Sequence, residues 1–223
     1  MRKSLLMTTG LAWLALTGAA GAVTVTVSPG PANPTYFVGQ TIGSSDFTTA
    51  GGDTWSLLSG TAGVAVGTTP NVSAAPFGET TPYMAVEGGG TEQVVFGTAQ
   101  TSIKIYWGSI DASEAGTPSA GNVNGFSITV DGYTLTGSDL VALYGAHGDG
   151  SHTDPLANEW VTISGLGSFT TAEFTSSKNA FEFSLGSSVP EPATWAMMML
   201  GFAGLGYAAF RRNSKAQMTV SAI

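Results

Sequence analysis

An uncharged, largely apolar stretch near the C-terminus constrains this chain more than any other feature of its 223 residues. It runs from Ala193 to Phe210, and Arg211, Arg212 and Lys215 follow it. Eighteen helical residues at about 1.5 Å each span roughly 27 Å, close to a hydrocarbon core of about 30 Å. A buried helix of a globular domain is the alternative, but such helices seldom extend this far without a charge. We therefore expect a transmembrane helix at residues 193–210.

The charges and prolines around this stretch predict its orientation. Basic residues follow it and none closely precedes it, so the positive-inside rule places residues 216–223 in the cytoplasm. Everything before Pro190 would then lie outside the cytoplasm. Pro190 and Pro192 keep the approach extended, as an accessible processing site requires.

Residues 188–215 also carry a recognisable order of side chains: a Pro-Glu-Pro triplet, an aromatic start to the apolar stretch, spaced glycines and a basic end. This segment resembles the PEP-CTERM sorting signal of Gram-negative bacteria. The resemblance implies that an exosortase, a membrane peptidase, reads the triplet, that the helix holds the precursor in the inner membrane, and that the two arginines stop transfer. The residues concerned are Pro190, Glu191, Pro192, Trp195, Arg211 and Arg212.

The N-terminus predicts a secretory signal peptide over residues 1–22. Arg2 and Lys3 precede an apolar run from Leu5 to Leu16, and small residues follow it. Ala20 and Ala22 have the small-x-small spacing that a signal peptidase reads, which gives a mature start at Val23. An uncleaved anchor is the alternative, although so short an apolar run spans a membrane poorly.

The region between the two ends is strongly acidic. Residues 23–189 hold fourteen Asp or Glu against only Lys104 and Lys178, a net charge of −12 compared with −8 for the whole chain. This charge opposes nucleic acid and anionic lipid as partners and favours cations such as calcium. Cysteine is absent, so disulfides and thiolate sites are excluded.

Residues 23–187 predict one all-β domain, an antiparallel and jelly-roll-like β-sandwich. Short runs rich in Val, Ile, Thr and aromatic residues alternate with clusters of Gly, Ser, Asn, Pro and Asp. The expected strands are residues 23–28, 54–58, 63–66, 82–87, 92–96, 102–107, 125–130, 133–136, 160–164, 169–174 and 180–185.

Local patterns sharpen three of these predictions. Asp131-Gly132 offers the two-residue turn of a tight hairpin. Phe181, Phe183 and Leu185 alternate with Glu182 and Ser184, which predicts a last strand with one buried face. The segment at 138–144 is expected to form a short helical turn capped by its first or second residue, Ser or Asp.

Several segments of the second half are similar to a group of exosortase-dependent surface proteins of unknown biochemical role. In that group a Tyr-Asn pair often follows the first segment, whereas Ala112, Ser113 and Glu114 follow it here. The segments are Tyr106–Asp111, Phe126–Leu135, Thr136–Leu140, Ala157–Val161 and Ser177–Phe183.

The best candidate for a metal site is a cluster of two imidazoles and two carboxylates formed by His147, Asp149, His152 and Asp154. Oxygen ligands suit calcium and the imidazoles suit zinc. An ordinary exposed polar loop is the simpler interpretation, because Asp149-Gly150 and Asp154-Pro155 are common turn dipeptides.

Aromatic residues suggest a second kind of site. The rings of Trp55, Trp107, Trp160 and Tyr106 could stack on sugars, with Tyr106 and Trp107 the preferred pair, although core packing is the commoner fate of large aromatics in strands. Enzymatic function is not expected, because the chain has two histidines and no nucleophile-elbow or zinc-protease motif.

The sequence therefore predicts an exported, non-catalytic surface protein of a Gram-negative bacterium. Its precursor would sit in the inner membrane, and an exosortase would pass it to the cell surface or the extracellular matrix. An association with exopolysaccharide or biofilm is expected. A secreted carbohydrate-binding module is the main alternative, and a glycoside-cleaving enzyme with two facing carboxylates remains open.

Overall fold

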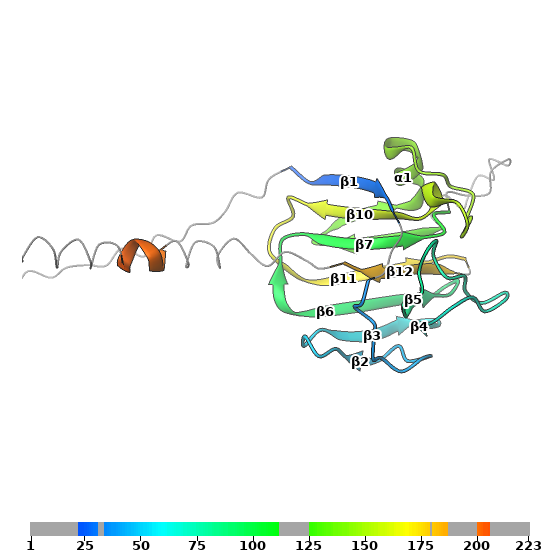
Figure 1. Cartoon of the computed structure of the whole chain (residues 1–223), viewed down its shortest axis with the longest axis horizontal. Coiled ribbons are helices and arrows are strands. Elements are labelled where there is room, and N and C mark those ends of the chain that lie inside the picture. The colour runs from blue at the N-terminus through cyan, green and yellow to red at the C-terminus, as the bar shows by residue number, and fades with distance from the viewer. Residues whose placement is uncertain (1–21, 31–33, 112–124, 179, 187–199, 206–223) are drawn as a thin grey trace, which may run out of the picture.

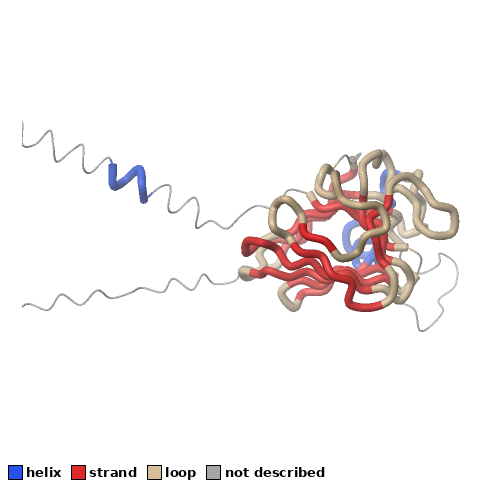
Figure 2. The backbone as a smooth tube through the Cα atoms, turned by 90° about the horizontal axis from the view of Figure 1, so that it is seen from below, coloured by secondary structure: helices blue, strands red, loops and turns tan. Residues whose placement is uncertain are grey.

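The computed structural model describes residues 22–30, 34–111, 125–178, 180–186 and 200–205. In this part of the chain two antiparallel sheets pack into a β-sandwich (Figure 1). Strands form nearly all of the regular structure of the domain (Figure 2). The expected all-β class is therefore confirmed.

Each sheet has six strands, and most connections pass from one sheet to the other. The first sheet has the order β1 (Thr24–Pro29), β10 (Glu159–Ser164), β7 (Ile103–Gly108), β12 (Phe181–Leu185), β5 (Tyr83–Val86) and β4 (Ala62–Ala65). The second has the order β2 (Phe47–Thr48), β3 (Thr54–Ser59), β6 (Thr91–Gln100), β11 (Phe169–Ser176), β8 (Phe126–Val130) and β9 (Tyr133–Thr136).

Every strand expected from the sequence is present, and the described residues contain one further strand. The extra strand, β2, has only two residues, too few to show an alternating pattern. Asp131 and Gly132 both have positive φ, 49° and 74°, as the expected tight turn between β8 and β9 requires. The hairpin prediction is therefore confirmed.

The helical turn begins earlier than expected. Helix α1 spans Gly137–Tyr144, and its N-cap is Thr136. The Thr136 hydroxyl accepts from the Asp139 amide, while the Asp139 carboxylate accepts from the Thr136 amide. Capping by Ser138 or Asp139 was thus the wrong prediction, since Asp139 is the third-position partner of this capping box.

Aromatic side chains from both sheets meet in the core. Phe174 of β11 stacks on Phe183 of β12 with ring centroids 4.0 Å apart. Trp55 of β3 stacks on Phe174 at 5.7 Å, and Phe126 of β8 stacks on Phe181 at 5.2 Å. Stacked aromatic pairs bury large apolar areas, so the Phe174–Phe183 and Phe126–Phe181 contacts hold the two sheets together without disulfides.

The last strand is buried on both faces, which corrects the expectation of one buried face. Phe183 faces the core, and Glu182 and Ser184 on the opposite face are also buried. A long connection between β4 and β5, residues 66–82, lies over that face; we call it the covering loop. Its Ala74 amide donates to Glu182 Oε1 at 2.8 Å. Alternation along one strand cannot reveal such a cover, because the loop comes from elsewhere in the chain.

A glycine allows the covering loop to lie close to the sheet. A Cβ atom at Gly108, the last residue of β7, would lie 2.5 Å from Pro76 Cγ. The Tyr106 hydroxyl donates to the Phe77 carbonyl at 2.7 Å, and the Tyr83 hydroxyl donates to the Gly67 carbonyl at 2.6 Å. Both tyrosines therefore fasten the loop with their polar ends while their rings are buried.

The strand registers give the sandwich two distinct ends. Thr24 pairs with Ser164 and Leu185 pairs with Ile105, so the chain enters β1 and leaves β12 at the same end of the first sheet. We call this the exit end. Glu182 pairs with Gly108 at the opposite end, which we call the loop end.

Candidate functional site

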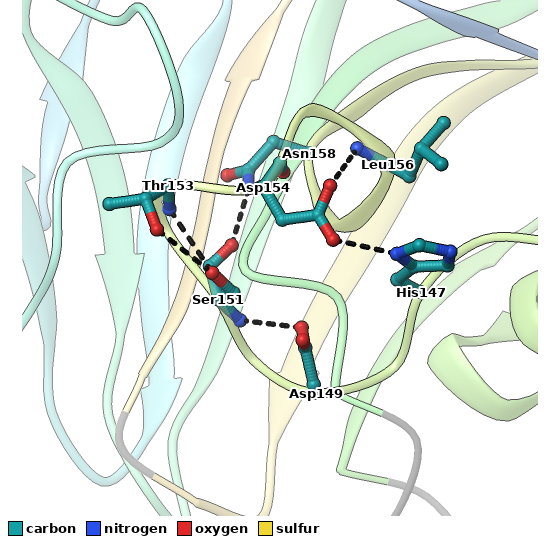
Figure 3. Close-up of polar contacts among 7 residues, drawn as sticks. All are labelled: His147, Asp149, Ser151, Thr153, Asp154, Leu156 and Asn158. Atoms are coloured by element: carbon teal, nitrogen blue, oxygen red, sulfur yellow. Dashed lines mark hydrogen bonds and ion pairs between the residues drawn. The ribbon is translucent and has the colours of Figure 1, made fainter.

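The candidate metal residues lie at the loop end, in the segment 145–158, which we call the histidine loop. Gly145 ends α1 in the left-handed conformation, and a 3-10 turn, η1 (Pro155–Ala157), lies within the loop. His147 Nδ1 lies 2.6 Å from Asp154 Oδ2 (Figure 3). Asp154 Oδ1 accepts from the Leu156 amide at 2.9 Å. The Asp154 carboxylate thus caps η1 and holds the imidazole at once.

The other two candidate metal ligands, Asp149 and His152, do not contact the His147–Asp154 pair in this way. Asp149 Oδ1 accepts from the Ser151 amide, the pattern of an Asx turn (Figure 3). Asp149 also forms an isolated β-bridge with Asp111, and His152 lines a cleft beside the loop. Among the described residues, no group of three His, Cys, Asp or Glu side chains is placed to hold a metal ion.

The ionisation of the loop reflects this pairing. The hydrogen bond with Asp154 raises the pKa of His147, and the same bond lowers the pKa of Asp154. Both side chains are partly exposed, so solvent screens the ion pair. Burial raises the pKa of nearby Glu159, and the His147 charge partly opposes that increase.

Asn158 connects three segments of the loop end and is completely buried. Its Oδ1 accepts from the backbone amides of Phe77 and Ser109, each at 3.0 Å. Its Nδ2 donates to the carbonyls of Ser151 and Asp154 at 2.6 and 2.8 Å (Figure 3). One amide therefore uses its full hydrogen-bonding capacity to join the covering loop, the end of β7 and the histidine loop.

A cleft of about 490 Å³ opens between the covering loop and the histidine loop. We call it the polar cleft. Its walls carry small polar side chains, with apolar contact from Pro70, Val72 and Phe126. Asp111, His152 and Glu182 bring the ionisable groups to its described lining. Its volume lies within the usual range of small-molecule sites.

Two side chains lining the polar cleft are almost completely buried. Ser109 is 7% exposed and Glu182 is 2% exposed. Among the described residues, Ser109 Oγ and Glu182 Oε2 have no hydrogen-bond partner of good geometry. Burial raises the pKa of Glu182 to about 8, although the Ala74 amide and the Ser109 hydroxyl lie close enough to lower it. The carboxyl is therefore largely protonated at neutral pH.

The structure places the aromatic candidates away from solvent. Tyr106, Trp107 and Trp55 are fully buried, so none offers a ring face to a sugar. The prediction of a glycan contact at Tyr106 and Trp107 is therefore wrong, because both rings are packed in the interior. Trp160 is partly exposed, but the Lys104 ammonium lies 4.6 Å from its ring centroid and Tyr106 packs beside it.

The predicted processing residues lie mostly outside the described residues. They include Ala20 at the signal cleavage site, while the neighbouring Ala22 is described and exposed. Of the expected transmembrane span only residues 200–205 are described, and they are helical and exposed. The described part of the chain contains no helix long and apolar enough to span a membrane. The sorting residues outside the description are Pro190, Glu191, Pro192, Trp195, Arg211 and Arg212.

Comparison with known families identifies the tail. Residues 188–213 match the family model of the PEP-CTERM protein-sorting motif. The match confirms the resemblance seen in the sequence. It gives the chain an exosortase-dependent signal for export and membrane-associated sorting to the cell surface. No curated protein and no solved structure matches the chain.

Sequence reasoning missed Ser109, Asn158 and Glu182 as members of one site. Each lies in a different segment of the chain. The structure brings the three segments together, since Ser109 donates its amide to Asn158 and Glu182 pairs with Gly108. No local pattern could have placed the three residues together, because they lie far apart in the chain.

Proposed function

We propose that the chain is an exported, non-catalytic surface or matrix protein, whose β-sandwich is delivered by exosortase processing at Pro190–Pro192. The observation that carries this proposal is the sorting-motif match at residues 188–213. The apolar stretch would hold the precursor in the inner membrane. Processing would then release the sandwich or attach it elsewhere at the surface, in association with exopolysaccharide or biofilm.

The position of the tail supports this proposal. The last strand of the sandwich, β12, ends at Leu185, and the matched motif begins at residue 188. A cut within the motif would remove no strand from either sheet. The sandwich would therefore keep its whole core after processing, as a delivered cargo must.

The polar groups of the histidine loop support a non-catalytic role. Asp149 and Asp154 each accept a backbone amide of their own loop, and Asp154 also holds His147. These hydrogen bonds stabilise turns. They engage the carboxylate oxygens that a catalytic acid or base would need. We also propose that the histidine loop can bind calcium through its carboxylates in addition to stabilising its turns.

Replacing Glu191 is expected to block processing. In the native host the wild-type protein should have an intact mass that ends within the Pro190–Pro192 region and should fractionate with the surface or medium. Glu191→Ala should retain the full tail and remain with the inner membrane, because the peptidase loses the charged centre of its recognition triplet. Intact-mass spectrometry of each cell fraction measures both results.

Glu87→Ala is the matched control, since it removes a carboxylate from the sandwich and leaves the tail unchanged. It should be processed like the wild type. An uncut tail in the wild type and both variants would contradict exosortase processing and make the chain a simply anchored domain.

A further inference from the structure

The outer side of β1 is an open edge of the first sheet. β1 is the outermost strand of that sheet and pairs with β10 on its inner side (Figure 1). Among the described residues, no backbone hydrogen bond reaches its outer side. An open edge offers its amides and carbonyls to any strand that lies alongside, so it is a potential binding surface.

The other three edges of the two described sheets are protected. The Gly43 amide donates to the Val64 carbonyl at 2.7 Å, and the Val64 amide donates to the Ser44 carbonyl at 3.0 Å, so this segment covers the outer side of β4. β2 has only two residues, and β9 has four, the last of which is the N-cap of α1. Short and covered edges prevent sheets from pairing edge to edge. β1 differs from them, because it has six residues and no charged side chain.

The ladder with β10 determines which groups of β1 are free to bond outward. Ser164 Oγ donates to the Thr24 carbonyl at 3.3 Å, so the Thr24 backbone faces β10. The bonding direction alternates along an antiparallel strand, so Val25 and Val27 turn their amides and carbonyls outward. Pro29 belongs to the same outward set, where its missing amide hydrogen costs no bond to β10.

The residues of β1 are almost symmetric about Thr26. Val25 and Val27 flank it, and Thr24 and Ser28 come next. If two such strands pair antiparallel about Thr26, each Val25 opposes a Val27 and the two exchange both of their backbone hydrogen bonds. The valine side chains lie on the inner face and the hydroxyl side chains on the exposed face, so like side chains meet on both faces. The strand is therefore its own complement.

We propose that β1 pairs antiparallel with β1 of a second copy of this chain, centred on Thr26, and so joins the two first sheets edge to edge. The exit ends of the two copies then point in opposite directions, because the two strands run in opposite directions. The contact therefore joins copies that have been released, or copies tethered to facing surfaces, and not neighbours in one membrane.

Thr26→Lys tests the contact. It places two ammonium groups opposite each other at the centre of the paired strands, so the dissociation constant of the dimer should rise roughly tenfold or more. The side chain is exposed, so the melting temperature of the dilute protein should not change. Thr134→Lys is the matched control, because it makes the same change at an exposed threonine on β9, the edge of the second sheet. It should leave the dissociation constant unchanged.

The measurement is sedimentation velocity of the full chain in a density-matched detergent, over a series of protein and salt concentrations. Residues 23–189 carry a net charge of −12, so the two copies repel each other at low ionic strength. Sodium chloride screens this repulsion and should tighten the dimer. Association through the tail would be distinguished by its persistence in Thr26→Lys.

A single cysteine reports the register, because the chain has no cysteine of its own. Opposed residues of a non-bonded antiparallel pair have Cα atoms about 4.5 Å apart, which suits a disulfide. Thr26→Cys should therefore form a covalent dimer on mild oxidation, measured by intact mass. Thr24→Cys is the control, because its two copies would be offset by about 14 Å along the strands. A mixture of Thr24→Cys and Ser28→Cys should form a mixed disulfide.

Three results would overturn the proposal. One is a monomer at every concentration, which would leave the edge to a strand of a different protein. Another is a dimer that Thr26→Lys leaves intact, and the third is oxidation that links Thr24→Cys as fast as Thr26→Cys. None of them bears on exosortase processing, since a monomeric chain can still be cut. An uncut Glu191→Ala protein should form the dimer like the wild type, so the two proposals can fail separately.

Discussion

Raising the pH from 5 to 8 is expected to lower the free energy of unfolding by several kcal/mol. Burial raises the pKa of both Glu92 and Glu182 from 4.5 to about 8, and the Asp46 charge contributes at Glu92. Between these values the folded chain binds protons that the unfolded chain has released. Stability therefore falls as pH rises, by at most about 1.4 kcal/mol per pH unit for each carboxyl.

Other groups shape the limits of this profile. Burial also raises the pKa of Glu79 and Glu159, and the raised pKa of His147 acts in the same direction. The lowered pKa of Asp154 acts oppositely, since its contribution is lost only as the pH falls below its ordinary value of 3.8. Stability should thus be greatest near pH 5 and level off above the pKa of about 8.

Urea unfolding of the full chain at half-unit pH steps measures this profile. Glu92→Gln is the informative variant, because Glu92 is fully buried on β6 and neither of its carboxylate oxygens has a partner among the described residues. Its stability should depend less steeply on pH than that of the wild type. A flat wild-type profile between pH 5 and 8 would show that both carboxyls titrate normally.

Asn158→Ala is expected to lower the free energy of unfolding by about 4 kcal/mol. The change leaves two amides and two carbonyls without the side chain that now joins them. Each buried polar group left unpaired costs roughly 1–3 kcal/mol, and partial access of water reduces the sum. The melting temperature should fall by roughly 8–16 °C for a domain of this size.

Gln93→Ala provides the comparison. Gln93 donates one partly buried hydrogen bond to Glu173 across β6 and β11, so its loss should cost about 1 kcal/mol or less. Calorimetry of the full-chain variants measures both. Equal melting temperatures for Asn158→Ala and Gln93→Ala would mean that the three segments are held by other contacts.

The sequence predicted the strands well because their side chains repeat with the period of a pleated sheet. Phe181, Phe183 and Leu185 are all buried, as their alternation predicted, and Asp131-Gly132 forms the predicted hairpin turn with positive φ at both residues. The sorting motif could also be recognised from the sequence, because its residues are contiguous in the chain. Local patterns of this kind can be recognised without knowing which distant residues are in contact.

The cleft could not be predicted in the same way. Glu182 is buried by a loop more than a hundred positions earlier in the chain, through the hydrogen bond from Ala74. Alternation therefore assigned Glu182 to a solvent face. Similarly, Tyr106 is on the outward face of β7 and is buried by the covering loop, so exposure could not be inferred from its strand position.

The attachment of the tail to β12 also has a mechanical consequence. Tension applied beyond Gly186 enters the first sheet at a strand that is bonded to β7 on one side and β5 on the other. The pull acts along the strand, so it shears the rungs of both ladders together rather than peeling them one after another. A sandwich tethered by this central strand should withstand drag from a hydrated polymer better than one hung from an edge.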